Sequence, residues 1–246
     1  MAVALSPPLR LTDLGDTAFN VEFGDGIDRA TNARVTALAA AIRHRPPAGL
    51  VEVVPTFRSL LVSYDPLATC RAVIEAEVMA LAAGCDEAPA ATGRSWRIPV
   101  CYDDDLGPDL AEIRRATGLS RAEVIALHAG TGYFVYMLGF MPGFAYLGDT
   151  PPALRLPRRD TPRVKVPAGS VAIADAMGAV YPWDSPGGWH LLGRTPAVMF
   201  DLGRDPPSLL AAGDRVAFVP VGRDEYEAAC RDPGRMAPAR LLVGDC

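Results

Sequence analysis

Positive charge gathers in one short segment of this 246-residue chain. Residues 157–170 read PRRDTPRVKVPAGS, with four cations within eight positions: Arg158, Arg159, Arg163 and Lys165. In an extended chain, Arg159, Arg163 and Lys165 would share one face because side chains alternate. A row of cations suits a carboxylate or a phosphate, which arginine can hold through two parallel hydrogen bonds. The alternative is a solvated basic edge strand, and the sequence leaves both interpretations open.

A second segment combines aromatic rings with glycines. Residues 181–195 read YPWDSPGGWHLLGRT. Large rings such as Trp189 beside the pair Gly187-Gly188 indicate a concave pocket. His190 could act there as a general base or a hydrogen-bond donor near neutral pH, although a single histidine is more often structural.

A third segment, GFMPGF at residues 139–144, is followed by Tyr146. Glycines at this density let the backbone approach a ligand or another strand, and Phe144 and Tyr146 would supply a flat apolar wall. The alternative is a tight turn within a barrel core.

Other functional signatures are missing from the sequence. It contains no GxxxxGK[ST], GxSxG, HExxH or GxGxxG motif, which excludes the common phosphate-loop, hydrolase-elbow, zinc-protease and dinucleotide patterns. Five cysteines without a CxxC pair argue against a disulfide framework and a zinc site. A net charge of −5 argues against a general nucleic-acid or anionic-membrane binder, and the cytoplasm is the expected location.

The elements that must position these residues fall into two parts. Residues 1–86 are expected to form a small α+β domain, with strands and helices at Arg10–Leu14, Ala18–Phe23, Asp28–His44, Leu50–Pro55, Ser59–Tyr64 and Leu67–Ala83. The stretch EAPAATG, Glu87–Gly93, reads as a linker because it breaks both periodicities.

Residues 94–246 are expected to form a second, mainly-β domain. A strand at Trp96–Tyr102 precedes two short helices, Leu106–Thr117 and Arg121–Ala129, the second capped by Ser120. Short apolar runs between glycines and prolines then predict a closed or nearly closed β-barrel. Residues 124–148 carry no formal charge, but five glycines and Pro142 favour a buried strand and turn over a membrane helix.

Three stretches together resemble one known family. They are GFMPGFAYLGD, PRRDTPRVKVPAGSVAIA and YPWDSPGGWHLLGRTP, and LGD and VEFGD near the N-terminus fit as well. The pattern is similar to that of the 5-oxoprolinase B-subunit family, also described as Kip-type kinase inhibitors or allophanate hydrolase subunit 1. The resemblance covers residues 10–220, nearly the whole chain.

The resemblance implies a fold, a reaction and partners. The fold would be an α+β N-terminal domain followed by a cyclophilin-like β-barrel. The chain would act as the B subunit of an ATP-dependent 5-oxoprolinase. Its partners would be the homologous C subunit and the A subunit. This complex opens 5-oxo-L-proline to L-glutamate, using ATP with magnesium at the level of the complex. The alternatives are an inhibitor of a sensor histidine kinase and a subunit of urea or allophanate metabolism.

Read with the resemblance, the residues give a candidate site without a metal. We expect catalytic roles for His190, Arg163 and Arg194. The expected substrate- or nucleotide-binding residues are Phe144, Tyr146, Arg158, Arg159, Lys165, Gly187, Gly188 and Trp189. Arg159, Arg163 and Lys165 are expected to face a pocket bordered by Trp189 and His190. Arg163→Ala is therefore expected to leave the melting temperature nearly unchanged while lowering turnover.

Overall fold

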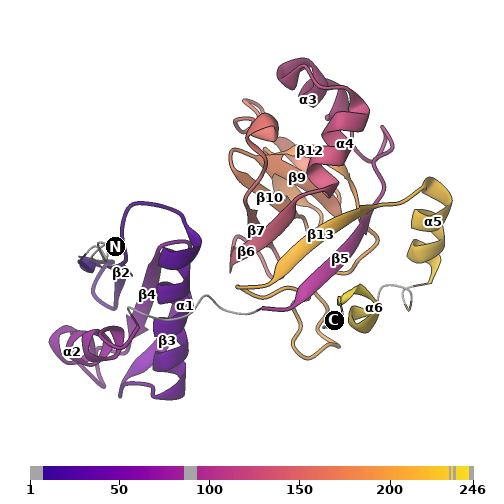
Figure 1. Ribbon diagram of the computed structural model, residues 1–246. Helices are drawn as coiled ribbons and strands as arrows, with labels where there is room; N and C mark the ends of the chain where they lie inside the picture. The colour runs from indigo at the N-terminus through magenta and orange to yellow at the C-terminus, as the bar shows by residue number, and fades with distance from the viewer. Residues whose placement is uncertain (1–7, 86–92, 233, 235–236, 244–246) are drawn as a thin grey trace, which may run out of the picture. The chain divides into compact units, whose positions relative to one another are not determined.

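The computed structural model describes residues 8–85, 93–232, 234 and 237–243 of the chain (Figure 1). The chain divides into two compact units, Met1–Ala91 and Thr92–Cys246. The predicted linker at residues 87–93 lies, apart from Gly93, outside the described residues. Each unit is therefore described by itself.

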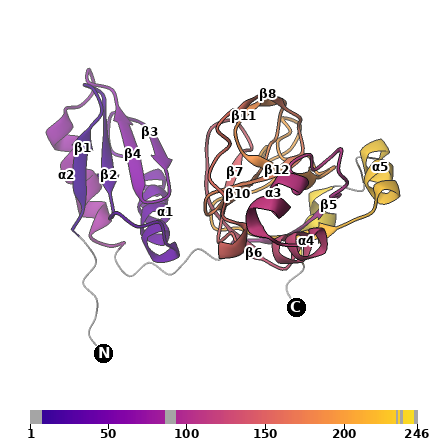
Figure 2. The ribbon, with the colours of Figure 1, turned by 90° about the horizontal axis from the view of Figure 1, so that it is seen from above.

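The described part of the N-terminal unit is an antiparallel sheet with two helices. The strand order is β1-β2-β4-β3, seen side by side in Figure 2. The elements are β1 (Arg10–Asp13), β2 (Ala18–Glu22), α1 (Arg29–His44), β3 (Leu50–Pro55), β4 (Ser59–Tyr64) and α2 (Arg71–Ala82). Alternate residues of β2 and β4, such as Phe19 and Leu60, are fully buried with residues of both helices, so the helices cover one face.

The helix predicted at Leu67–Ala83 begins later than expected, at Arg71. The Asp65 carboxylate accepts a hydrogen bond from the Leu67 N–H at 2.9 Å, and the Asp65 carbonyl accepts from the Ala68 and Thr69 N–H groups. A short aspartate side chain that bonds the following backbone favours a turn over a helix start. Residues 65–69 therefore form a turn, and the Leu67 side chain is 96% exposed.

The C-terminal unit contains a barrel-like sheet. Among the described residues, its seven strands lie in the order β12-β9-β10-β7-β6-β13-β5. They are β5 (Ser95–Val100), β6 (Gly132–Leu138), β7 (Ala145–Gly148), β9 (Ser170–Ala174), β10 (Met177–Val180), β12 (His190–Arg194) and β13 (Arg215–Pro220). A separate two-stranded ribbon pairs β8 (Arg163–Val166) with β11 (Ser185–Gly187). The prediction of many short strands in this half is confirmed.

The two edge strands of this sheet meet just beyond their ends, which nearly closes the barrel. Cys101, directly after β5, and Arg194, at the end of β12, exchange two backbone hydrogen bonds of 2.9 Å. A Cβ atom at Gly193 would lie 2.5 Å from the Cys101 carbonyl oxygen, so this contact requires glycine. The contact that nearly closes the barrel thus depends on glycine at this position.

Helices cover one end of the barrel-like sheet, as Figures 1 and 2 show. They are α3 (Leu110–Thr117) and α4 (Arg121–Ala129), and η1 (Pro152–Leu154), α5 (Arg223–Arg231) and α6 (Pro238–Leu241) complete the unit. The capping box predicted at Ser120 is confirmed, since its side chain and that of Glu123 each bond the other's backbone N–H. The helix predicted from Leu106 begins only at Leu110, because residues 103–107 form a turn on the Asp103 carbonyl.

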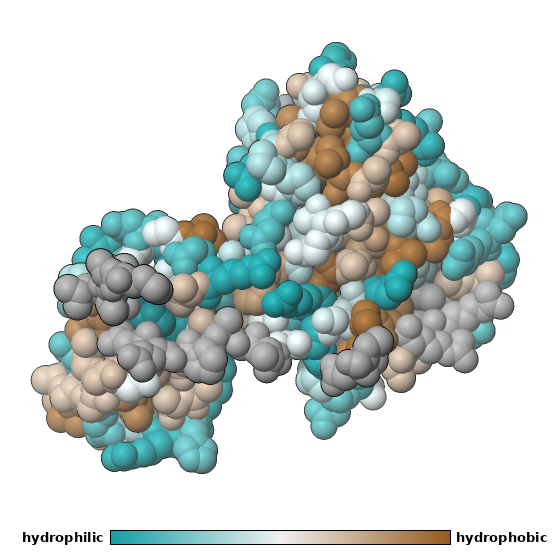
Figure 3. Space-filling model, viewed as in Figure 1, coloured by the Kyte–Doolittle hydropathy of each residue, from teal (hydrophilic) through white to brown (hydrophobic). Residues whose placement is uncertain are grey.

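The apolar core of this unit lies between the sheet and helices α3 and α4. Trp96, Ile98, Tyr133 and Leu147 are each at most 1% exposed. On the visible face of the unit, hydrophilic and hydrophobic residues are intermixed (Figure 3). No helix within the described ranges is long and apolar enough to cross a bilayer. Residues 132–144 instead form a buried strand and a turn, as predicted.

Candidate functional site

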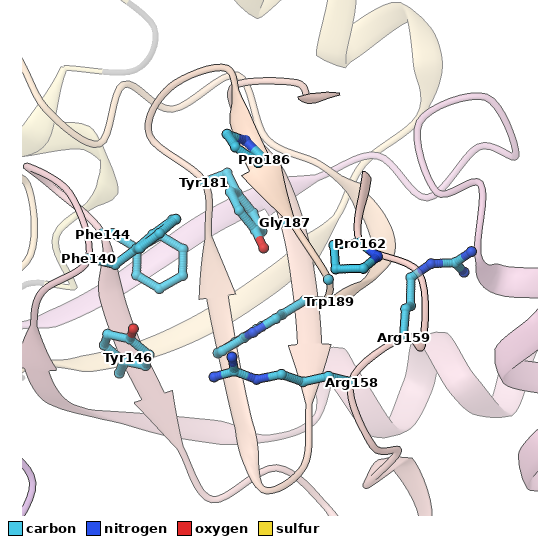
Figure 4. Close-up of a pocket in the computed structure, with 11 residues that line it drawn as sticks. Phe140, Phe144, Tyr146, Arg158, Arg159, Pro162, Tyr181, Pro186, Gly187 and Trp189 are labelled. Atoms are coloured by element: carbon cyan, nitrogen blue, oxygen red, sulfur yellow. The ribbon is translucent and has the colours of Figure 1, made fainter. Parts of the chain in front are cut away.

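A cavity of about 300 Å³ opens beside the ribbon of β8 and β11 (Figure 4). Three stretches of the chain contribute to it: the turn before β7, the segment before β8, and the strands around the diglycine. The lining residues are Phe140, Phe144, Tyr146, Arg158, Arg159, Pro162, Tyr181, Pro186, Gly187, Gly188 and Trp189. The three segments singled out in the sequence therefore meet at one pocket.

Aromatic rings make up most of the pocket wall, and Phe144 lies at their centre. Its ring centroid is 5.0 Å from that of Tyr146, 5.3 Å from that of Tyr181 and 5.9 Å from that of Trp189. All three pairs are edge-to-face, the arrangement that the ring quadrupoles favour. The rings therefore support one another and form a rigid apolar wall suited to a small flat molecule.

Two glycines in these segments allow close contacts that a Cβ atom would block. A Cβ atom at Gly187 would lie 2.4 Å from the Tyr181 hydroxyl oxygen, so only glycine lets this phenol reach the pocket. Gly143 adopts a φ of +81°, and a Cβ atom there would lie 2.6 Å from Cβ of Phe200. Gly187 thus needs glycine for close approach, and Gly143 needs it both for close approach and for its left-handed backbone conformation.

The two phenols of the pocket are held in their neutral form. Burial raises the pKa of Tyr181 to about 12, and it also raises the pKa of Tyr146. Figure 4 shows the Tyr181 hydroxyl group directed toward Gly187, at the edge of the pocket. A neutral phenol can donate a hydrogen bond, so these groups are suited to a carbonyl oxygen of a ligand.

Arg158 is the cation that the pocket leaves available. Its guanidinium carbon lies 5.8 Å from the ring centroid of Trp189, and Figure 4 shows the side chain extended along that ring. Within the described residues, Arg158 has no hydrogen bond or ion pair. Its planar fork of donors is free to bind a carboxylate.

The next cations along the chain are already paired, and this corrects the expected row. Arg159 and Arg163 both bond to the buried Asp109, and Arg159 also bonds to Glu112. Lys165 instead forms a 2.8 Å ion pair with Asp184 and is 69% exposed. Pro162 interrupts the segment, so β8 begins only at Arg163. The three cations therefore do not form one row facing the pocket.

His190 lies at the start of β12 and is buried, but it does not line the pocket. Its Nε2 is 2.9 Å from the carbonyl oxygen of Pro157. A carbonyl can only accept, so Nε2 carries the proton and donates. Nδ1 is buried without a partner in the part of the chain that the structure describes. This geometry suits a fixed structural donor, whereas a general base would need access to the pocket.

Arg194 is also outside the pocket. Its Nε donates to the carbonyl oxygen of Ala168 at 2.8 Å, close to the barrel closure. Of the residues proposed from the sequence, the structure brings together at the pocket Phe144, Tyr146, Arg158, Arg159, Gly187, Gly188 and Trp189. Those that it places elsewhere are Arg163, Lys165, His190 and Arg194.

The site residues named from the sequence did not include Asp109 or the pocket aromatics Phe140 and Tyr181, although both aromatics lie in segments that the sequence analysis singled out. Asp109 is only 3% exposed, and a carboxylate that is buried to this extent normally has partners. The signal was GPD before an amphipathic helix, which predicts an N-cap, and Asp109 does stand at that position of α3. Phe140 has a φ of +68°, an unusual conformation for a residue that is not glycine.

The described residues do not gather metal ligands. No three His, Cys, Asp or Glu side chains among them stand close enough together to hold a metal ion. The pocket offers one available guanidinium and mainly apolar rings. A triphosphate with magnesium requires several cations and oxygen ligands, so these residues do not fit that group.

Comparisons with known proteins agree with the motif pattern. The family description of the carboxyltransferase domain, subdomains C and D, matches residues 9–210. The chain is 39% identical over 233 residues to the 5-oxoprolinase B subunit of Bacillus subtilis (strain 168), covering 89% of this chain and 95% of the relative.

Two solved structures share the fold. The crystal structure of TTHA0988 is 41% identical with a TM-score of 0.73, and the match covers 83% of this chain but only 40% of that longer one. The K. lactis urea amidolyase shares the fold at 21% identity, with a TM-score of 0.76 over 98% of this chain and 16% of that one.

Proposed function

The chain belongs to the carboxyltransferase-domain family that includes the B subunits of 5-oxoprolinases, and we propose that it is the B subunit of a 5-oxoprolinase complex and holds 5-oxo-L-proline in its pocket. The available guanidinium of Arg158 over the Trp189 ring is the observation that carries the assignment of the pocket. The barrel-like sheet supports the cyclophilin-like fold that the motifs imply.

The chemistry of this substrate matches the pocket walls. 5-Oxo-L-proline is a flat five-membered lactam with one carboxylate. Arg158 would bind the carboxylate, and the rings of Phe144 and Trp189 would enclose the lactam. The hydroxyl of Tyr181 would donate to the lactam carbonyl oxygen, which withdraws electron density from the amide carbon. These residues bind, orient and exclude water, and the pocket offers no group placed to attack the amide.

Hydrolysis of the lactam is therefore proposed to need the other subunits. We propose that the homologous C subunit and the A subunit complete the site. We also propose that ATP with magnesium is used at the level of this complex. The present residues do not fit ATP, so no step of its chemistry is assigned to this chain. The purified chain alone should release no glutamate from 5-oxo-L-proline, ATP and magnesium. Activity should appear when both partner subunits are added, and turnover by the single chain would contradict this assignment.

The pocket assignment is tested by replacing Arg158 in the reconstituted complex. Arg158→Ala should raise the KM for 5-oxo-L-proline at least tenfold, because a lost charge-assisted bond costs about 2–5 kcal/mol of binding when the partner charge is left buried. Arg158→Lys should restore only part of the affinity, since lysine lacks the planar fork.

The matched control is Arg97→Ala, which removes an exposed arginine of β5 outside the pocket. Its KM should stay within twofold of the wild-type value. An Arg158→Ala complex with the wild-type KM would show that the carboxylate binds elsewhere. Preferential turnover of urea by the wild-type complex would favour the urea-metabolism alternative.

A further inference from the structure

We propose that Asp109 is a positioning residue that acts on the substrate through Arg158. Asp109 neither lines the pocket nor contacts Arg158, yet it holds the segment that carries this arginine. We call residues 157–163 the strap. The proposal rests on the proposed function, in which Arg158 binds the substrate carboxylate.

The Asp109 carboxylate joins the strap to the barrel-like sheet. Its Oδ1 accepts from Nη1 of Arg159 at 3.0 Å and from Nη2 of Arg163. Its Oδ2 accepts from the backbone N–H of Leu191 in β12 at 2.7 Å. One buried carboxylate therefore fixes two strap side chains to the strand that follows Trp189.

The strap backbone is fixed on both sides of Arg158. On one side, Nε2 of His190 donates to the Pro157 carbonyl at 2.9 Å. On the other, the Arg159 N–H donates to the Gly188 carbonyl at 2.8 Å. With its neighbours held, the Arg158 backbone has little freedom, and its side chain extends along Trp189, while Arg159 points away from the pocket (Figure 4). The arrangement limits the entropy lost when Arg158 binds a carboxylate.

The charges of this cluster also cancel. Arg159 and Arg163 supply two positive charges, and Asp109 and Glu112 supply two negative ones. The positive charge of Arg158 is left without a carboxylate partner in the described part of the chain.

Removing the charge of Asp109 would release Arg159 and Arg163 and loosen the strap, so Arg158 would lose its fixed position. The substitution should therefore weaken substrate binding more than it slows the chemical step.

The test is Asp109→Asn in the reconstituted complex. Asparagine keeps the size of the side chain and an oxygen for the Leu191 N–H but loses the charge that binds two guanidinium groups. The KM for 5-oxo-L-proline should rise about tenfold, and kcat should stay within about twofold. The control is Glu112→Gln, which removes only the half-exposed partner of Arg159 and should leave KM within twofold.

The double substitution separates positioning from general damage. If Asp109 acts through Arg158, adding Asp109→Asn to Arg158→Ala should raise KM no further. An additional increase of about tenfold in that background, or a wild-type KM for Asp109→Asn alone, would overturn the proposal. A wild-type KM for Arg158→Ala would instead refute the pocket assignment, so the two failures are distinguishable.

A second variant keeps the test valid if Asp109→Asn does not fold. Arg159→Gln breaks one side-chain link of the strap but leaves Asp109 bonded to Arg163 and Leu191. It should show the same rise in KM, and the rise should again vanish beside Arg158→Ala. An unchanged KM, or an effect that persists without Arg158, would contradict the role of the strap. Tryptophan fluorescence spectra and melting curves of each variant establish that it is folded.

Discussion

Asp109 and Asp214 are both buried aspartates of the C-terminal unit, at 3% and 2% exposure, but they bind different donors. Asp214 accepts from the backbone N–H groups of Arg94 and Ala211, each at 2.9 Å, and from Nε1 of Trp96 at 2.7 Å. The half-exposed guanidinium of Arg94 adds one longer contact of 3.5 Å. Asp109 binds one backbone N–H and two guanidinium groups.

The kind of donor distinguishes Asp214, which supports the fold, from Asp109, which we propose supports substrate binding. The three shorter hydrogen bonds of Asp214 come from Arg94 and Trp96, at the start of β5, and from the turn before β13, so this carboxylate connects two parts of the sheet framework. Most donors of Asp109 stand on long side chains of the strap, so it holds a segment that has little secondary structure of its own. Loss of Asp214 should therefore affect folding first, whereas loss of the Asp109 charge should affect substrate binding first.

The largest expected effect is on stability, for Asp214→Ala. The substitution leaves the buried Nε1 of Trp96 and the part-buried backbone N–H groups of Arg94 and Ala211 without their acceptor, and a buried donor left unsatisfied costs about 1–3 kcal/mol. The free energy of unfolding should fall by about 3 kcal/mol. Urea unfolding followed by tryptophan fluorescence measures it, because Trp96, Trp183 and Trp189 are the three tryptophans of the sequence and all belong to the C-terminal unit. A smaller loss of unfolding free energy for Asp214→Ala than for Asp109→Asn would contradict the distinction between the two aspartates.

A second framework group should make stability depend on pH. His128 is fully buried, its Nδ1 lies 2.7 Å from the Tyr102 hydroxyl oxygen, and its ring stacks on Phe218. Burial lowers the pKa of His128 from 6.5 to about 3. Between these values the unfolded chain binds a proton that the folded chain does not. Stability should therefore fall as the pH falls, by about 1.4 kcal/mol per pH unit and about 2 kcal/mol at pH 5.

The pH experiment compares urea unfolding of the wild type and of His128→Phe at pH 7, 6 and 5. Phenylalanine keeps a ring against Phe218 but cannot take up a proton. The difference in stability between the two proteins should shift in favour of the variant as the pH falls. A difference that stays constant over this range would show that His128 is not the group responsible.

Arg163→Ala should have a smaller effect, but one larger than the nearly unchanged melting temperature expected from the sequence. Arg163 bonds to the buried Asp109, and hydrogen bonds to charged groups contribute about 1.5–3 kcal/mol. Because Asp109 keeps its other partners, a loss of about 1–2 kcal/mol is expected, or several degrees in Tm. Differential scanning calorimetry measures the shift. An unchanged Tm would mean that the strap does not depend on this bond.

The smallest effect is expected for Lys165→Ala, the neighbouring cation of β8. Its ion pair with Asp184 is exposed, and pairs of this kind contribute about 0–1 kcal/mol. Unfolding free energy should change by less than about 0.5 kcal/mol. Measured beside Arg163→Ala in the same buffer, it tests whether burial of the partner carboxylate decides the outcome. Equal losses for the two variants would contradict that explanation.

Short-range patterns predicted the local structure well. Strands at Leu50–Pro55 and Ser59–Tyr64 were predicted with their observed ends. In the second of them burial alternates along the whole strand, so the apolar pattern determines its buried face as well. The capping box at Ser120 was equally local. The start of α2 was wrong because the side chain of Asp65 competes for the same backbone groups.

The pocket was predictable and the partners of its cations were not. Glycines beside aromatic residues identified Phe144, Tyr146 and Trp189, because close packing of rings needs glycine nearby. The row of cations failed because Arg159 and Arg163 bind a carboxylate about 50 residues earlier, which no local periodicity reveals. The expected alternation of side chains also assumed an extended strand from Arg159 onward, whereas Pro162 delays the start of the strand to Arg163.

Lys165 is the single lysine of the 246-residue sequence, and its ammonium group is exposed on the ribbon that borders the pocket. Amine-directed reagents therefore meet one side-chain target in this chain. A fluorophore coupled there would report on ligand entry from a known position two residues after Arg163. In cross-linking of the assembled complex, every lysine-mediated bridge from this protein would start at the same strand, so each bridge would identify the part of a partner that lies near β8.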